Sequence, residues 1–121
     1  MNWVLDKNRP ICPQIGEQLA VMIAGGELKP NERLLSVRDV AVNAGINPNT
    51  AQKAFEQLGQ EGLIYAVRGS GWYVSEDIAK ANEVVARLMA EKTRDYFDGM
   101  RKLGQSAEQT KDYVKEWKTN E

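Results

Sequence analysis

The sequence predicts a mainly α-helical fold with a small β-hairpin, namely a winged helix-turn-helix followed by a two-helix C-terminal tail. Two short helical patterns lie on either side of a glycine turn in residues 36–62. A Gly-Ser-Gly connection at 69–71 joins two strand-like runs, and from about residue 76 the periodicity is helical only. We therefore expect one domain in residues 1–75 and a helical tail in residues 76–121.

Composition limits the classes of protein to consider. A chain of 121 residues forms one domain, or one small domain with an appendage. It has no apolar run of about 18 residues and no signal-peptide pattern, so we expect no membrane span and a cytoplasmic location. Cys12 is the only cysteine and histidine is absent, which excludes a disulfide framework and a Cys/His zinc site within one chain. We expect no metal, no cofactor and no enzyme activity.

The first helix is expected from about Pro13 to Ile23, because proline is tolerated in a first turn and apolar residues recur on one face. Those residues are Ile11, Ile15, Leu19 and Met22. Gly25 and Gly26 end this helix, and a turn around Pro30 precedes the next one.

The second helix is expected to start at Ser36, which with Asp39 matches the capping-box pattern. Gly45 supplies a left-handed residue that ends it. The third helix follows at once, with Asn47 as N-cap and Pro48 at the first helical position. The residues expected to be buried are Val37, Val40, Ala41 and Ala44 on the second helix and Ala51, Ala54, Phe55 and Leu58 on the third.

A β-hairpin, the wing, is expected after Gly62, with strands at 63–67 and 72–74. The connection Arg68-Gly69-Ser70-Gly71 has the glycines that tight hairpin turns of type I′ or II′ require. Trp72 and Tyr73 should point to opposite faces, one toward the core and the other partly exposed.

The tail carries two apolar rows that predict contact with another helix. In its long helix the row follows a 4/3 alternation if Thr93 fills one step, and Gly104 ends it. Ser106 and Gln109 then cap a last helix. The rows are Val85, Met89, Tyr96, Met100 and Leu103, then Thr110, Tyr113, Val114 and Trp117. We expect them to pair two chains, although packing within one chain is the alternative.

The outer face of the third helix begins with Asn49, Thr50, Gln52 and Lys53. Asn and Gln pair with adenine, Thr meets a base edge or thymine methyl, and Lys reaches phosphate or guanine. A solvated polar face is the simpler alternative, but the N-terminal position on the second helix of a helix-turn-helix favours the major groove of double-stranded DNA.

Arg38 lies in the first turn of a helix, where the macrodipole disfavours a cation. A phosphate outside the protein explains it better than helix stability does, and free N–H groups near Ser36 could hold the same phosphate. Pairing with Asp39 or another carboxylate is the alternative. At the wing, Arg68, Gly69, Ser70 and Gly71 are candidates for contact with the minor groove or the backbone.

Net charge is −1, and residues 1–75 carry seven basic and seven acidic residues. Because no part of the chain is strongly basic, a few placed cations must supply the attraction to DNA. We therefore expect affinity to come from two copies bound together, each reading half of a near-palindromic site.

Residues 10–74 resemble the DNA-binding domain of GntR-type bacterial transcription regulators. The resemblance rests on Pro10-Ile11, then GELKPNERL, LSVRDVA, GINPNTAQKAFEQLGQEGLI and GWYV, in order. It implies that Ser36 and Arg38 approach the DNA, together with Asn47–Lys53, Gly69 and Gly71. Many members carry arginine where this chain has Pro48 and Gln52, so another member's operator cannot be borrowed. The short tail resembles that of the YtrA-like subfamily, where it serves for dimerisation.

The sequence thus predicts a homodimeric, sequence-specific DNA-binding regulator, a repressor. A winged-helix module for protein interaction is the alternative that neutral charge permits. The identity or existence of a small-molecule effector does not follow from the sequence, and a pocket between tail helices in a dimer is the place expected for one.

Overall fold

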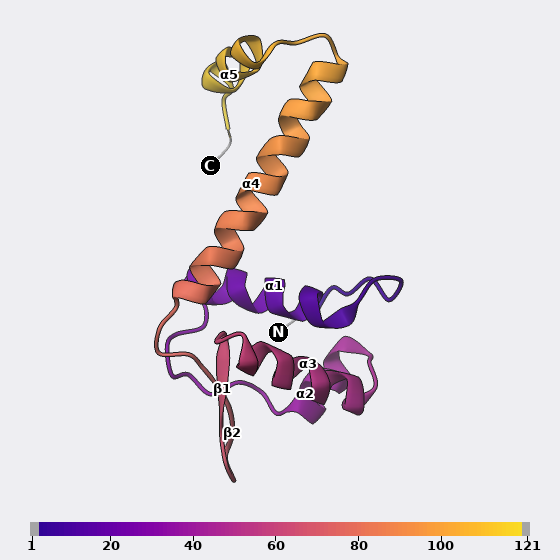
Figure 1. Ribbon diagram of the computed structural model, residues 1–121, viewed down its shortest axis with the longest axis vertical. Helices are drawn as coiled ribbons and strands as arrows, with labels where there is room; N and C mark the ends of the chain where they lie inside the picture. Colours follow the sequence, from indigo (N-terminus) through magenta and orange to yellow (C-terminus); the bar gives the residue numbers. More distant parts are fainter. Residues whose placement is uncertain (1–2, 120–121) are drawn as a thin grey trace. The chain divides into compact units, whose positions relative to one another are not determined.

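The computed structural model describes residues 3–119 and confirms the predicted fold class, with five helices and one two-stranded sheet in that range (Figure 1). The chain forms two compact units, one up to Val85 and one from Ala86. The elements are α1 (Ile11–Ala24), α2 (Val37–Ala44), α3 (Pro48–Gln60), β1 (Ile64–Val67), β2 (Gly71–Val74), α4 (Ala79–Lys102) and α5 (Ala107–Glu116).

Helices α1 and α2 both pack against α3 in the first unit. Ile15 and Leu19 of α1, Val40 of α2, and Phe55 and Leu58 of α3 are buried together in one apolar core. These residues recur at helical spacing, so the pattern that predicted each helix also forms the core. This core holds α3 with its opposite face outward.

Helix α1 begins at Ile11, two residues before the predicted start. Pro10 has extended backbone angles, and Pro13 falls in the first turn, where a missing N–H breaks no helical hydrogen bond. The buried side chain of Gln14 donates to the carbonyls of Asp6 and Pro10 at 2.8 and 2.9 Å. It thereby fixes the N-terminal segment against the start of the helix.

The predicted helix ends around the turn between α2 and α3 are confirmed. Ser36 Oγ accepts a hydrogen bond from the Asp39 N–H at 3.1 Å, and Asn47 Oδ1 accepts one from the Asn49 N–H at 2.7 Å. Gly45 ends α2 with φ of 69°. These local caps set where the two helices stop and start, and so where the outer residues of α3 lie.

The wing is an antiparallel pair in which Ile64 lies opposite Val74 and Val67 opposite Gly71. Strand β1 begins one residue later than predicted, because the Leu63 N–H bonds to the Leu58 carbonyl at the end of α3. Strand β2 begins one residue earlier than predicted. Gly69 has φ of 79° at the third turn position and Arg68 has no positive φ. This is the pattern of a type II turn, not the expected type I′ or II′.

The two aromatic residues of β2 face opposite sides of the wing, as predicted, although both are half-buried. Trp72 packs edge-on against Phe55, with ring centroids 5.9 Å apart. Tyr73 stacks on Tyr65 of the neighbouring strand at 5.6 Å. Trp72 therefore joins the wing to α3, while the tyrosine pair stiffens its other face.

Cys12, the chain's single cysteine, lies at the contact between α1 and α3. Its Sγ donates a weak hydrogen bond to the carbonyl of Ala54, at 3.7 Å. Burial, and to a lesser degree the negative charge of Glu61, raises the pKa of the Cys12 thiol above its ordinary value. The sulfur therefore stays protonated at neutral pH.

Helix α4 starts at Ala79, three residues after the expected change of pattern, because Asp77 Oδ1 accepts a hydrogen bond from the Ala79 N–H at 2.9 Å. In the second unit, α4 ends near Gly104 and α5 begins with the predicted capping box. Ser106 Oγ accepts from the Gln109 N–H, and the Gln109 side chain accepts from the Ser106 N–H. Among the described residues, no helix combines the length and apolarity of a membrane span.

Candidate nucleic-acid interface

The outer face of α3 presents the polar residues that the sequence singled out. Asn49, Thr50, Gln52 and Lys53 are all exposed, while Ala51 between them is fully buried. The four side chains project from the first two turns, which is the part of a recognition helix that meets base edges. The structure therefore presents this whole set on one exposed face.

A fifth residue, Glu56, extends the outer face by one turn and was missed in the sequence. Its Oε1 accepts a hydrogen bond from Gln52 Nε2 at 3.0 Å. The spacing of four residues on one helix could have revealed this pair. The carboxylate directs the Gln52 amide and places a negative charge on the candidate interface.

Arg38 is exposed in the first turn of α2. The alternative interpretation was an ion pair with Asp39 or another carboxylate, but the described part of the chain shows no such bridge at Arg38. The Ser36 hydroxyl oxygen is already used as the N-cap acceptor, which leaves its hydrogen free to donate. A guanidinium and a hydroxyl donor thus lie two residues apart at one helix end, both suited to an oxyanion.

The turn of the wing divides its predicted contact residues into two groups. Arg68 and Gly69 are exposed at the tip. Ser70 is half-buried, and its hydroxyl forms a very short hydrogen bond with the Tyr73 hydroxyl. Gly71 is half-buried as well. Arg68 and Gly69 are therefore accessible to a ligand, whereas the Ser70 side chain is engaged in a hydrogen bond within the wing.

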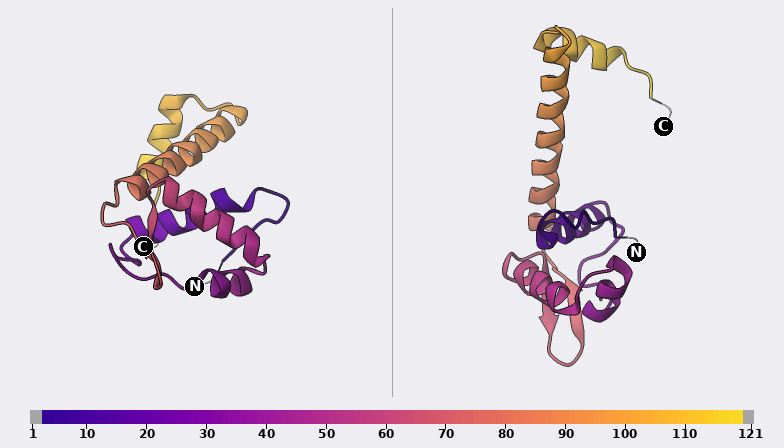
Figure 2. Two further views of the ribbon diagram at one scale, coloured as in Figure 1. Left: turned by 60° about the horizontal axis from the view of Figure 1, so that its bottom comes forward. Right: turned by 90° about the vertical axis from the view of Figure 1, so that its right-hand side faces the viewer.

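Arg33 is a second residue that the sequence did not single out. Its Nη2 donates a hydrogen bond to the Ser70 carbonyl at 2.6 Å. Sequence spacing gives no hint of this contact, because the two residues are 37 positions apart. The right-hand view of Figure 2 shows the hairpin that carries this turn extending beyond the ends of α2 and α3 within the first unit.

In the second unit, residues of the predicted dimerisation rows line an open apolar groove of about 780 Å³. The lining residues are Tyr96, Met100, Leu103, Gln105, Tyr113, Val114 and Trp117. Leu103 is 74% exposed and Trp117 60%, so the groove leaves large apolar surfaces in solvent. Thr110 of α5, another residue of these rows, is buried, and its Oγ1 donates to the Ser106 carbonyl.

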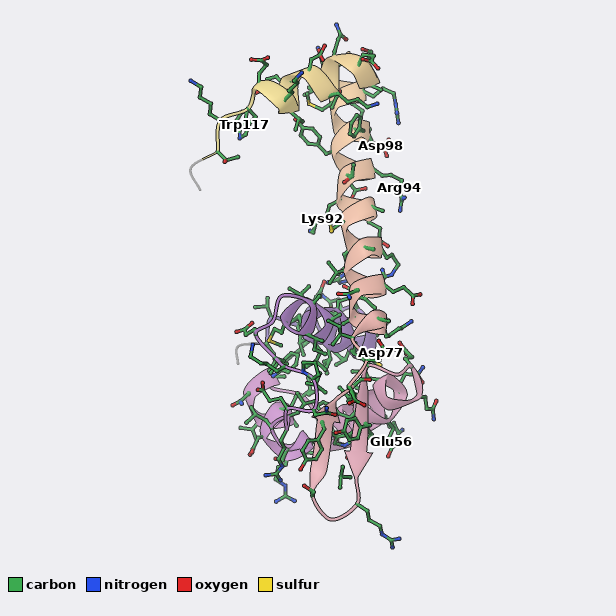
Figure 3. All side chains as sticks on the ribbon, turned by 90° about the vertical axis from the view of Figure 1, so that its left-hand side faces the viewer. Glu56, Asp77, Lys92, Arg94, Asp98 and Trp117 are labelled. Atoms are coloured by element: carbon green, nitrogen blue, oxygen red, sulfur yellow. The ribbon has the colours of Figure 1, made fainter. Side chains whose placement is uncertain are left out.

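The remaining predicted dimerisation residues differ in their surroundings. Met89 is 64% exposed on α4. Val85 is half-buried and packs against the core of the first unit, so it offers less surface to a partner. Charged side chains occupy other positions of α4, and Figure 3 shows Arg94 and Asp98 on the opposite side of the helix from Lys92.

The geometry defines a winged helix-turn-helix protein with an exposed polar recognition helix. Comparison with known proteins agrees with it: residues 13–74 match the model of the gntR family of bacterial regulatory proteins. The HTH-type transcriptional repressor YtrA of Bacillus subtilis is 34% identical over 109 residues, which are 88% of this chain and 83% of YtrA. The chain therefore belongs to the gntR family, and its similarity to YtrA extends into the tail.

One solved structure supports the same assignment, and a second shares the fold. A GntR family transcriptional regulator from Listeria monocytogenes is 32% identical and superposes with a TM-score of 0.76, covering 94% of this chain and all of the other. AraR(DBD) in complex with operator ORX1 has a TM-score of 0.51 at 24% identity, and covers 62% of this chain and 92% of that one. At that identity the second match establishes a shared fold alone.

Proposed function

We propose that this protein is a transcriptional repressor that binds a near-palindromic operator in double-stranded DNA as a homodimer, in the bacterial cytoplasm. The observation that carries the proposal is the first unit's outer surface. There an exposed Arg38, the polar start of α3 and an exposed Arg68 belong to one winged helix-turn-helix.

Each part of this surface suits one part of a DNA duplex. Asn49 and Gln52 can read adenine, and Thr50 can meet a thymine methyl, from a helix in the major groove. Arg38, Lys53 and Arg68 carry the charge that phosphates attract. AraR(DBD), which shares the fold, is bound to an operator, and this supports DNA as the ligand of the surface.

Homodimerisation is supported by the apolar groove of the second unit. Tyr113 and Trp117 form one wall, with ring centroids 5.8 Å apart, and both are more than half exposed. Large exposed apolar patches on small proteins mark interaction sites. A second copy of the tail would bury these rings and present two recognition helices related by twofold symmetry.

Charge gives an independent reason for two copies. The first unit's outer surface sets Arg38, Lys53 and Arg68 against Asp39 and Glu56, so a single copy carries little net positive charge there. Non-specific affinity for DNA grows with the number of phosphates neutralised. Doubling the surface doubles that number, and joint binding of two half-sites multiplies the affinities.

Selection of bound sequences from a random duplex library at moderate salt tests the proposal. The expected result is enrichment of an inverted repeat, bound with an affinity that falls steeply as salt rises. Failure to enrich any sequence would favour the alternative, a winged-helix module for protein interaction. Enrichment of a single, non-repeated half-site would retain DNA binding and refute the dimeric operator.

A further inference from the structure

The segment that precedes α2 pairs with the wing as an irregular third strand. The Val74 N–H bonds to the Glu32 carbonyl and the Leu34 N–H to the Trp72 carbonyl, both at 2.9 Å, and Arg33 lies opposite Tyr73 in an antiparallel bridge. Strand β2 is therefore hydrogen-bonded on both of its edges. This pairing brings the side chain of Arg33 alongside the hairpin.

From that position the guanidinium of Arg33 reaches the turn. Its Nη2 donates to the Ser70 carbonyl at 2.6 Å, and Nε and Nη2 lie 3.6 Å from the place that a Cβ on Gly71 would occupy. Within residues 3–119 no carboxylate forms an ion pair with it. One charge-assisted hydrogen bond thus fixes the turn, and the remaining donors of the fork stay available.

A chain of tyrosine contacts ties the same turn to the same segment. The hydroxyls of Ser70 and Tyr73 are hydrogen-bonded, Tyr73 stacks on Tyr65, and the Tyr65 hydroxyl donates to Asn31 Oδ1 at 2.9 Å. Arg33 and this chain both hold Ser70, the first through its carbonyl and the second through its hydroxyl. Strand β2 and the turn are therefore linked to residues 31–34.

Such fastening matters because the wing would be weakly ordered alone. Its two strands have four residues each, and isolated two-stranded hairpins are marginally stable in water. Gly69 and Gly71, with φ of 79° and 139°, add conformational freedom at the tip. Ordering the tip only on binding would lower affinity, so a tip ordered in advance binds more tightly.

We infer that Arg33 is a positioning residue of the DNA interface: it holds the wing's turn so that Arg68 and Gly69 meet the DNA. This rests on the proposed function. Arg33 acts through the turn and not through its charge alone. Loss of DNA affinity in Arg33 variants should therefore follow the loosening of the wing, and should depend on Arg68.

The test combines DNA titration with amide hydrogen exchange of the free protein. Arg33→Gln should speed exchange of the Ser70 amide and raise Kd for the selected duplex about tenfold, the value of one charge-assisted hydrogen bond. Arg94→Gln removes the same charge from an exposed site on α4 and should change neither measurement. A Kd for Arg33→Gln that matches wild type would overturn the inference.

A double-mutant cycle separates positioning from simple attraction. If Arg33 acts through the wing tip, Arg33→Gln should raise Kd for the duplex by about twofold or less in a protein that already carries Arg68→Gln. Equal losses in both backgrounds would show that the two cations act independently, and would refute the positioning role. Thermal unfolding of each variant checks that the first unit remains folded.

Arg33→Lys is a second test of the inference, because it keeps the positive charge while changing the group that bonds the Ser70 carbonyl. If Ser70 exchange is fast in this variant, weakened binding supports the inference, whereas wild-type affinity contradicts it. If exchange stays slow, wild-type affinity supports it and weakened binding contradicts it. Absence of DNA binding by the wild type would instead refute the proposed function, and exchange in the free protein would still report whether Arg33 holds the turn.

Discussion

Arg38 occupies a position that helix electrostatics disfavours by a few tenths of a kcal/mol, the first turn of α2, and it has no ion pair within the described residues. Arg38→Ala should therefore spare the fold and weaken DNA binding. We expect a loss of about tenfold on operator and scrambled duplexes alike, with a salt slope lower by about one. Fluorescence anisotropy across a salt series measures both quantities.

Asn49→Ala provides the contrast on α3. It should reduce by about 1–3 kcal/mol the binding free energy that distinguishes the operator's base pair at that position from other base pairs. Non-specific affinity for DNA should stay unchanged. Titration of the operator and of its single-base variants checks this. If Asn49→Ala weakened all duplexes equally, or Arg38→Ala affected the operator alone, the roles assigned to the two residues would be reversed.

Gly16 is required by packing. A Cβ at this position would lie 2.7 Å from Cδ2 of Leu58, which is buried in the core. Gly16→Ala should therefore destabilise the first unit by about 1–3 kcal/mol. Gly99 on α4 has open space around it, so Gly99→Ala should stabilise the helix by about 0.5–1 kcal/mol. Urea unfolding followed by circular dichroism gives both signs, and equal effects would contradict the packing argument.

At this scale, sequence reasoning located residues whose roles depend on near neighbours. Ser36 and Asn47 were predicted as caps because a cap bonds two or three residues away. Arg33 was missed because its partner Ser70 is distant in the sequence and adjacent only after the strands pair. Glu56 was missed although its spacing from Gln52 contained the signal.

Among the elements, α5 is short and depends on its capping box. Ser106→Ala removes the acceptor for the Gln109 N–H and should cost about 1 kcal/mol, lowering the helix content of the tail. Ser106→Asp keeps an acceptor at the N-cap and should restore it. Backbone chemical shifts of residues 107–116 report helix content directly. Unchanged shifts in Ser106→Ala would mean that tertiary contacts alone hold α5.

Elements could be predicted from the sequence to the extent that local chemistry sets their ends. Gly45 and Asn47 fixed the turn between α2 and α3 to the residue. The irregular strand at residues 31–34 was not predicted. Pro30 and Asn31 indicated a turn over residues 28–32, and pairing with β2 is a tertiary event. The type II turn needs a positive φ at its third position, which Gly69 supplies, so the presence of glycines alone could not decide between the turn types.

For the whole molecule, the apolar groove of the tail leads to a test of assembly. Trp117→Ser and Leu103→Ser should convert a dimer into a monomer in sedimentation at micromolar concentration. Affinity for the inverted repeat should fall by at least about a hundredfold, while affinity for a half-site stays the same, because only joint binding is lost.

Val21→Ser is the matched control, since Val21 is an exposed apolar residue of α1, outside the groove. It should leave sedimentation unchanged. A wild-type protein that sediments as a monomer would refute the dimer directly. The sequence predicted the apolar rows from their spacing, but spacing could not show that Val85 packs against the first unit's core, which only the folded chain reveals.

The Cys12 thiol is a natural chemical probe of the contact between α1 and α3. Since Cys12 is the only cysteine, a thiol-reactive dye reads out this helix contact without any prior mutagenesis. Its raised pKa keeps the thiolate scarce at neutral pH, so labelling speeds up as pH rises or as the helices part. Comparing the labelling rate of Cys12 with and without operator would then show whether DNA binding strengthens the packing of α3 against α1.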